Sequence, residues 1–392
     1  MKPGEQPRAF LLLLVVLGML GPLTLNILVP SLPTLPKALD TTRESAQLTF
    51  SLYLFGMALS QLVLGPLADR LGRRPVLLIA LVSYVASSLV AYAAPNIGVL
   101  IAARAIQSFG ATAGLTLGRT MIRDRYDRNA SASIIGYVTM AMVLAPMISP
   151  LMGATIDEHF GWRAIMAFCA ILGGLSFALA LFNLPETRPV TLVAATTKEV
   201  LTRTLELTVN ARYMAYWGST AFCSAMFFAF LGTAPHLMIE VLGIPKTEYA
   251  YWFMSLSFGY MLGNFVSGRG VMRLGIDRLI HWGNVAGLIG AVTILIPALF
   301  GILNPLVLFA PAMIMSFGNG LVLPNAIAGG LAVNPAAAGA GSGLMGFGQI
   351  GVGAVLSFFT AKYTHDSVLI LAVTMLVCAI IAQTSSWVSR QL

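Results

Sequence analysis

The chain has 392 residues, of which 57% are hydrophobic and only 10% are charged, and its net charge is +8. Soluble domains are about 25% charged, so this composition excludes a soluble enzyme, a DNA-binding protein and a disordered chain. Most of the 23 basic residues lie in short loops and do not gather on one face, which argues against a nucleic-acid partner. A chain this apolar keeps its surface from water only inside a bilayer.

Apolar segments long enough to cross a membrane recur along the whole sequence. A helix of roughly 20 apolar residues spans the hydrocarbon of a bilayer. The first segment is too long for a signal peptide, and Pro30, Pro33 and Pro36 follow it in place of a cleavage site, so we expect it to be retained. The sequence therefore predicts an all-α membrane protein with twelve transmembrane helices, at about 9–31, 46–68, 75–94, 97–119, 131–154, 162–184, 212–238, 248–270, 278–300, 305–327, 339–361 and 366–388.

Lysine and arginine are unevenly divided between the two sets of loops. With the N-terminus in the cytoplasm, most of these residues fall on the cytoplasmic side. The outer loops hold only Lys37, Arg43, Arg163, Lys246 and Lys362. This imbalance has the sign of the positive-inside rule. We therefore expect both termini in the cytoplasm, as an even number of spans requires.

The longest cytoplasmic segment, 185–211, divides the chain into two related parts. Its TKEVLTRTLEL stretch predicts a short amphipathic helix at the membrane surface. The parts are an N-terminal six-helix bundle, 1–184, and a C-terminal six-helix bundle, 212–392. A constant shift matches Gly65, Arg70, Leu71 and Gly72 to Gly268, Arg273, Leu274 and Gly275, and Ser-Phe-Gly recurs at 108–110 and 316–318. The sequence thus predicts two six-helix repeats that face a shared cavity.

The most specific motif is GPLADRLGRRP at 65–75, in the turn between the second and third spans. We expect Gly65 to let neighbouring helices approach closely and Gly72 to permit a tight turn. Asp69 is placed to accept hydrogen bonds from a helix N-terminus or from an arginine of the other bundle. Such a contact would hold one conformation closed. The motif therefore predicts a conformational switch made of Gly65, Asp69, Arg70, Gly72, Arg73 and Arg74.

This stretch resembles the loop 2–3 signature of the major facilitator superfamily, and the resemblance covers all twelve spans. Arg104–Gly110 is similar to the helix 4 signature of that superfamily. The segment 145–153 is similar to the helix 5 signature of its proton-coupled drug antiporters, in which Pro146, Pro150 and Gly153 would shape a bend against the other half.

More narrowly, VPSLPTLPKAL, GRTMIRD (118–124) and HFGWRAIM (159–166) resemble the bicyclomycin/chloramphenicol-resistance (Bcr/CflA) subfamily. This resemblance implies a multi-pass protein of the bacterial inner membrane that exports small organic molecules, often drugs, in exchange for protons. By the same resemblance, Asp124 would join Asp69 and Arg70 in a cytoplasmic charge relay.

One position departs from that subfamily. Its usual helix 1 aspartate is Asn26 here, and asparagine neither titrates nor attracts a cation strongly. No carboxylate lies deep in any predicted span. An importer or facilitator of a metabolite such as a nucleoside, a sugar or an organic anion therefore remains the alternative.

Arg104 is the strongest single candidate for substrate binding, because it lies roughly 10 Å deep in its span at 1.5 Å per residue. An intramembrane arginine costs at least about 2.5 kcal/mol and is a site hypothesis by default. We expect Arg104, Asn26, Tyr53 and Gln107 to form one polar corner of the cavity. Weaker candidates for an adaptable apolar lining are Tyr137, Met140, Phe227, Phe230, Tyr260 and Gln349.

Other function classes lack their motifs. The Gly-rich run at 339–353 has no Lys-Ser/Thr of a phosphate loop, and close packing of the eleventh span explains it better. No paired carboxylates, metal ligands or activated nucleophile occur at membrane depth, so we expect no enzyme, no metal and no cofactor. The expected energy source is the proton motive force. The expected partners are a small-molecule substrate, protons and the lipid bilayer, and we expect a monomer.

Overall fold

The structure is a computed structural model, and it describes residues 8–126, 134–135, 138, 142, 144–189, 196–364 and 367–392. The described elements are helical throughout. They are α1 (Arg8–Ile27), η1 (Val29–Thr34), α2 (Leu35–Ala38), α3 (Arg43–Leu71), α4 (Arg73–Tyr92), α5 (Ile97–Arg125), α7 (Leu144–Phe160), α8 (Trp162–Asn183), α9 (Thr197–Val209), α10 (Ala211–Pro235), η2 (His236–Val241), α11 (Lys246–Leu274), α12 (Ile276–Leu299), α13 (Pro305–Val333), η3 (Pro335–Ala337), α14 (Ala338–Tyr363) and α15 (Leu369–Gln391).

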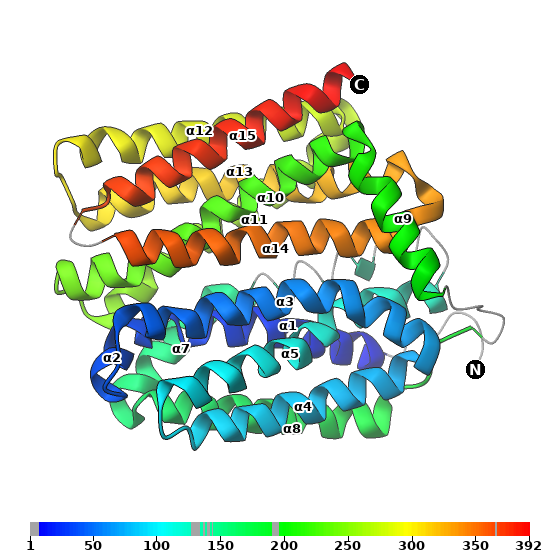
Figure 1. The fold of residues 1–392 in the computed structure, drawn as a ribbon, viewed down its shortest axis with the longest axis horizontal. Coiled ribbons are helices and arrows are strands. Elements are labelled where there is room, and N and C mark those ends of the chain that lie inside the picture. Colours follow the sequence, from blue (N-terminus) through cyan, green and yellow to red (C-terminus); the bar gives the residue numbers. More distant parts are fainter. Residues whose placement is uncertain are drawn as a thin grey trace.

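The long helices form two layers that follow the order of the chain (Figure 1). Helices α1 to α8 pack on one another and make the N-terminal half, whereas α10 to α15 make the C-terminal half. The halves meet chiefly along α3 and α14, and again where α7 contacts α11. The turn between α3 and α4, helix α9 and the end of α15 lie at one end of the molecule, which we call the arginine-rich end.

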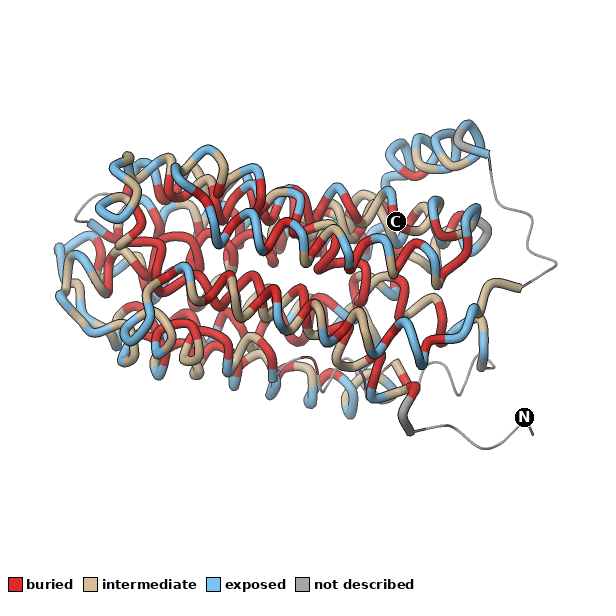
Figure 2. Tube along the Cα trace, turned by 90° about the horizontal axis from the view of Figure 1, so that it is seen from below, coloured by how far each residue is buried: buried red, intermediate tan, exposed pale blue. Residues whose placement is uncertain are grey.

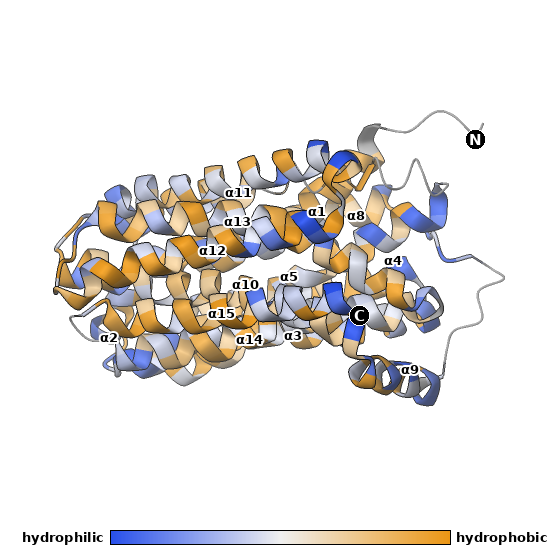
Figure 3. Cartoon of the chain, turned by 90° about the horizontal axis from the view of Figure 1, so that it is seen from above, coloured by the Kyte–Doolittle hydropathy of each residue, from blue (hydrophilic) through white to orange (hydrophobic). Residues whose placement is uncertain are grey.

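Ten of the described helical segments are long and apolar enough to span a bilayer. The predicted span at 248–270 corresponds to α11, which has 29 residues but is less apolar because its middle is rich in Tyr, Trp, Ser and Gly. The predicted span at 131–154 is described only in part and ends in α7. Hydrophilic side chains concentrate towards the ends of the helices and on α9 (Figure 3). The all-α transmembrane architecture expected from the sequence is therefore confirmed.

Prolines end the first long helix earlier than hydropathy alone suggests. The predicted span runs to residue 31, but α1 ends at Ile27 and the chain continues as a tighter 3₁₀ helix, η1. Pro30 and Pro33 lie in this segment and have no backbone N–H for an α-helical hydrogen bond. The buried η1 packs against α7 and α10 and so brings the two halves together at the end opposite the arginine-rich end.

Glycines allow the central helices to approach closely. A Cβ at Gly114 of α5 would lie 2.0 Å from the carbonyl oxygen of Leu17 in α1. In the Gly-rich α14, a Cβ at Gly343 would lie 3.0 Å from the carbonyl oxygen of Gln61, and one at Gly348 would lie 2.2 Å from the indole nitrogen of Trp217. The glycine run of α14 therefore packs closely, as predicted, and its contacts reach both halves. Figure 2 shows the buried positions where the helices face one another.

Helix α9 lies at the arginine-rich end of the molecule (Figure 1). It begins with a capping box in which the Thr196 side chain accepts from the Glu199 N–H and the Glu199 carboxylate accepts from the Thr196 N–H. The helix packs against α10 and α14. The amphipathic helix predicted in the 185–211 segment is therefore present.

Polar contacts tie the halves together at the opposite end. Lys246, at the start of α11, forms an ion pair with Asp157 of α7 and donates to the Thr34 hydroxyl at 3.1 Å. Arg43 donates to the Thr364 carbonyl at 2.8 Å. Nearby, Ser51 and Ser357 share a hydrogen bond of 3.1 Å. These contacts join α3, α7 and η1 of one half to α11 and α14 of the other.

The outer surface carries an apolar groove between α3, α4 and α5. The groove holds about 500 Å³, and its lining includes Phe55, Ile79 and Phe109. Phe55 and Ile79 are exposed, which suits contact with lipid hydrocarbon. None of the described residues predicted to bind substrate lines this groove.

Candidate functional site

The α3–α4 turn is built around Gly72. Its φ of 101° and ψ of 154° lie in a region that only glycine adopts readily. The tight turn predicted at Gly72 is therefore confirmed. The expectation for Gly65 is wrong, because a Cβ added there would meet nothing within 4 Å. Gly65 lies beside Pro66, and no atom of the described residues comes within close-packing distance of the position a Cβ would take.

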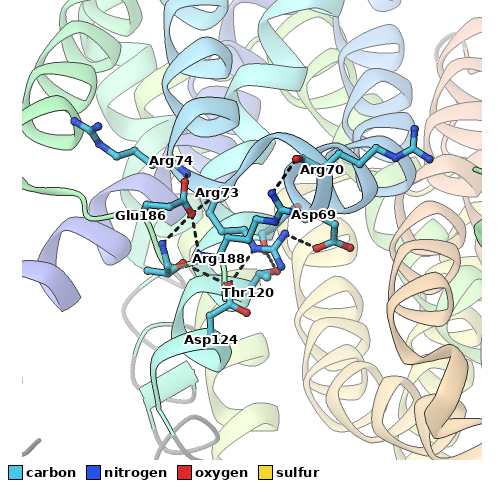
Figure 4. A network of polar contacts seen from close by, with 10 residues as sticks. Asp69, Arg70, Arg73, Arg74, Thr120, Asp124, Glu186 and Arg188 are labelled. Carbon is cyan, nitrogen blue, oxygen red and sulfur yellow. Dashed lines mark hydrogen bonds and ion pairs between the residues drawn. The ribbon is translucent and has the colours of Figure 1, made fainter. Parts of the chain in front are cut away.

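Arg73 is the centre of the charge network at this turn (Figure 4). Its side chain is buried, forms an ion pair with Asp69 one helical turn earlier, and donates through Nε to Asp124 of α5 at 3.0 Å. We expected Asp69 to accept from a helix N-terminus or from an arginine of the other bundle, and Asp69, Arg70 and Asp124 to form one charge relay. In the structure Asp69 pairs within its own half, and Arg73 takes the bridging position. The reason is geometric, since Arg73 points inwards while Arg70 is exposed.

Glu186, which follows α8, holds the same turn from the other side. Its carboxylate accepts from the backbone N–H groups of Arg73 at 3.0 Å, Arg74 at 3.1 Å, Thr187 at 2.9 Å and Arg188 at 2.8 Å. Two of these donors are otherwise unpaired groups at the N-terminus of α4. Burial raises the pKa of the Glu186 carboxyl, but the four donors outweigh burial and lower that pKa below its ordinary value.

The segment after α8 adds further links that we did not predict. Arg188 donates to the Arg70 carbonyl at 3.1 Å, and the Thr187 hydroxyl donates to Asp124 at 3.4 Å. Arg74 donates back to the Leu181 carbonyl at 2.8 Å. From sequence alone this segment is indistinguishable from an ordinary linker. The feature of the sequence that could have indicated this role is a Glu between two prolines, Pro185 and Pro189, immediately after a span.

A second polar cluster surrounds Arg104 inside the N-terminal half. The guanidinium donates to the Thr24 carbonyl at 3.2 Å and to the Gln107 amide oxygen at 2.7 Å. It also lies 4.0 Å from the centre of the Tyr53 ring, a cation–π geometry. The Gln107 amide continues the chain of contacts to Ser88 at 2.7 Å. The predicted grouping of Arg104, Tyr53 and Gln107 is therefore present.

Two features of this cluster differ from the prediction. Asn26 does not join it, because its amide nitrogen donates to the Pro22 carbonyl at 2.7 Å on its own helix. Arg104 and Gln107 have no exposed surface, so the cluster lies inside the helical core of its half. The pair Thr24 and Tyr84, joined by a 2.6 Å hydrogen bond, completes the cluster. Sequence offered no signal for these two residues, which are ordinary members of apolar spans.

The weaker candidates occupy different surroundings. Phe230 is fully buried and packs edge-to-face on Phe309 at 5.3 Å, so the structure places it in the aromatic core of the C-terminal half and not on an open surface. Phe227, Tyr260 and Gln349 are partly exposed. Two further candidates lie outside the described residues: Tyr137 and Met140.

The helix 5 signature lies in α7. Pro150 is buried within the helix, and a Cβ at Gly153 would lie 1.8 Å from the carbonyl oxygen of Ile27. Gly153 therefore packs closely on α1 of the same half. We had expected it to lie against the other half. Pro146, one turn earlier than Pro150, is partly exposed. The contact of α7 with the other half is made against α11.

Comparison with known proteins identifies the class. The profile of the Major Facilitator Superfamily matches residues 14–358. The solved xylose transporter XylE from E. coli, in a partially occluded inward-open conformation, has the same fold with a TM-score of 0.75 and 13% identity over 98% of this chain and 97% of that chain. The chain therefore belongs to the Major Facilitator Superfamily. It is a multi-span membrane protein and a transporter of small molecules, not an enzyme.

Two curated relatives show which members of the superfamily this chain resembles. A bicyclomycin resistance protein homolog of Haemophilus influenzae is 26% identical over 95% of this chain and 94% of the relative. Multidrug resistance protein D of Escherichia coli is 31% identical over 88% of this chain and 87% of the relative. The similarity thus extends over nearly the whole length of these relatives. The sequence-based resemblance to drug-resistance members of the superfamily is confirmed.

Proposed function

We propose that this protein exports small organic molecules, including drugs, across the bacterial inner membrane in exchange for protons. The observation that carries the proposal is the near full-length similarity to relatives named for bicyclomycin and multidrug resistance. The positive-inside distribution supports placing the arginine-rich end and both termini in the cytoplasm. We further propose that the protein acts as a monomer.

The proposed mechanism is alternating access between the two halves. The Lys246–Asp157 pair and the Arg43–Thr364 contact support closure at the outer end in the conformation described. When the outer end opens, the cytoplasmic end closes. Asp69, whose side chain is 39% exposed, remains accessible for contacts with the C-terminal half in that second state. The network of Asp69, Arg73 and Asp124 is then a latch that stabilises the outward-open form.

The Arg104 cluster is the proposed centre of coupling between substrate and protons. Its hydrogen-bonding groups are carbonyls, hydroxyls and an amide, and no carboxylate among the described residues pairs with Arg104. Arg104 Nε and Asn26 Oδ1 are buried without a hydrogen-bond partner. A buried donor and a buried acceptor without partners are costly, so both are available to substrate or water during transport.

The lack of a carboxylate among the described partners of Arg104 favours one alternative function. An asparagine in the helix 1 position and a cluster without carboxylates suit facilitated transport of a metabolite, which needs no proton-binding group. The pH of a lightly buffered vesicle suspension separates the two functions. Antiport moves a stoichiometric number of protons when substrate is added, and facilitation moves none.

The experiment that tests export is growth of an efflux-deficient bacterium on a panel of antibiotics, dyes and biocides. The strain expresses either the wild type or Arg104→Ala at matched membrane levels. We expect the wild type to raise tolerance to a subset of compounds and the variant to lose that effect. Protection by both proteins would leave export standing and remove Arg104 from the mechanism. Protection by neither would overturn drug export and favour the metabolite function.

A further inference from the structure

One face of α3 contacts the C-terminal half at the end opposite the arginine-rich end, which we call the tied end because polar contacts join the halves there. Arg43, Gln47 and Ser51 follow one another at intervals of four residues and therefore lie on one side of α3. Arg43 donates to the Thr364 carbonyl at 2.8 Å. Ser51 shares a hydrogen bond of 3.1 Å with Ser357. Gln47 lies between these two contacts along the helix.

The Gln47 side chain packs against the C-terminal half without a hydrogen bond from its amide nitrogen. A Cβ added at Gly232 of α10 would lie 2.8 Å from this nitrogen and 3.1 Å from the Ser357 Cβ. The amide nitrogen therefore lies against α10 and beside Ser357 of α14. Gln47 is only 6% exposed, and its amide nitrogen is buried without a hydrogen-bond partner among the described residues.

Closure of the tied end therefore has opposite effects at neighbouring positions of α3. Ser357 donates to the Ala354 carbonyl at 2.9 Å, so Ser51 is the donor in the hydrogen bond between the two serines. That bond is gained when the halves meet. The Gln47 amide nitrogen instead gives up hydration by water and receives no acceptor in return, which is costly for a buried donor.

We propose that Gln47 is a gating residue, whose amide weakens closure of the tied end and so lowers the free energy needed to open it. This role rests on the proposed alternating access and assigns a residue to its opening step. When the halves separate at the tied end, the amide nitrogen donates to water or to an oxygen atom of a transported molecule. A group that lacks a partner only in the closed conformation shifts the equilibrium towards the open one. Arg43 and Ser51 act in the opposite direction.

Double electron–electron resonance on purified protein in lipid nanodiscs tests the proposal. Spin labels are attached at Phe160→Cys of α7 and Lys362→Cys of α14, which are exposed positions in different halves at the tied end. The three native cysteines are buried, so the labels go to the introduced ones. All proteins carry Lys246→Gln, which removes the ion pair with Asp157 and raises the open population to a measurable level.

We expect Gln47→Met, which keeps the length of the side chain and removes the amide, to lower the ratio of open to closed molecules about tenfold, equivalent to about 1.4 kcal/mol. The matched control is Ser51→Ala, one turn along the same face of α3. It loses a hydrogen bond that is formed in the closed conformation, so it should raise the same ratio about threefold. A role in packing alone would change the Tm without shifting the two ratios in opposite directions.

Three results overturn the proposal: a ratio that rises or stays constant in Gln47→Met, shifts of the same sign in Gln47→Met and Ser51→Ala, or a single unchanged distance in every protein. If Gln47→Met does not reach the size-exclusion profile of its parent, Gln47→Leu takes its place.

The spin-label measurement needs no substrate, so its outcome is separate from that of drug export. Opposite shifts in a protein that protects no cell would keep the gating role and overturn export. Protection of cells by a protein without these shifts would do the reverse.

Discussion

The α3–α4 turn of the N-terminal half and the α11–α12 turn of the C-terminal half share a backbone but not a charge network. Gly72 and Gly275 occupy equivalent positions and have similar angles, with φ of 101° and 77° and ψ of 154° and 162°. In the first turn three carboxylates gather around the buried Arg73. Its counterpart in the second turn is Ile276.

The C-terminal turn forms no ion pair among the described residues and uses single hydrogen bonds instead. Asp277 accepts from the Tyr216 hydroxyl at 2.9 Å, and its backbone carbonyl accepts from Arg390 at 2.7 Å. The glycine turn is therefore a property of the repeat, whereas the buried arginine with its carboxylates belongs to one half alone. A conformational latch built from charges would be asymmetric, and the N-terminal turn would carry most of its energy.

The largest expected effect comes from removing the centre of the charged turn. Arg73→Met leaves Asp124 partly buried without its ion-pair partner, and breaking a buried pair costs about 3 kcal/mol or more. We expect a clearly lower Tm in detergent and loss of most transport. The comparison variant is Ile276→Ala at the equivalent position, which should cost only about 1 kcal/mol because Ile276 is partly exposed. Equal losses of Tm in the two variants would contradict the asymmetry.

A smaller effect is expected when each glycine is replaced by alanine. Both substitutions strain the backbone by about 1–3 kcal/mol. Only at Gly72 does the new Cβ also meet a neighbour, the Glu186 carboxylate oxygen at 2.7 Å, while at Gly275 it meets nothing within 4 Å. We therefore expect Gly72→Ala to lower the Tm more than Gly275→Ala. A larger drop in Tm for Gly275→Ala would contradict this prediction. It would show that Glu186 moves away from the new Cβ at no cost in stability.

The smallest effect is expected from Glu186→Gln, and it depends on pH. Because the folded pKa of Glu186 is lowered, its charge stabilises the folded protein above the ordinary carboxyl pKa of about 4.3, and this contribution is lost as the pH falls through the lowered value. The Tm difference between wild type and variant should be largest near neutral pH and shrink on acidification. Since Glu186 is largely exposed to solvent, a constant difference across this range would assign its role to packing.

The helices and their repeat could be predicted because they depend on chain-wide patterns. The length of an apolar segment predicts a transmembrane helix, because the bilayer is its solvent. The turn at Gly72 could be predicted because few residues other than glycine adopt its backbone angles. The predicted ends of the helices were less accurate than the predicted positions of the helices. Proline chemistry moved the end of α1 from residue 31 to Ile27, and α5 continues to Arg125, beyond the apolar part of its span.

Side-chain partners were harder to predict, because they depend on which way a helix is rotated. Sequence grouped Asp69, Arg70 and Asp124 in one charge relay, but the side chain that contacts both carboxylates is Arg73. It placed Asn26 beside Arg104, although the asparagine bonds to its own helix. Glu186 acts on residues more than a hundred positions away, and no local pattern records such a contact.

The polar contacts at the end opposite the arginine-rich end have a mechanical consequence. A helix of 29 residues such as α3 or α11 is about 43 Å long at 1.5 Å per residue. If the halves rotate about the tied end, each degree displaces the far end by about 0.75 Å at that length. Lys246 and Arg43 then act as the fulcrum of a long lever, and small adjustments of their side chains become ångström-scale openings at the arginine-rich end.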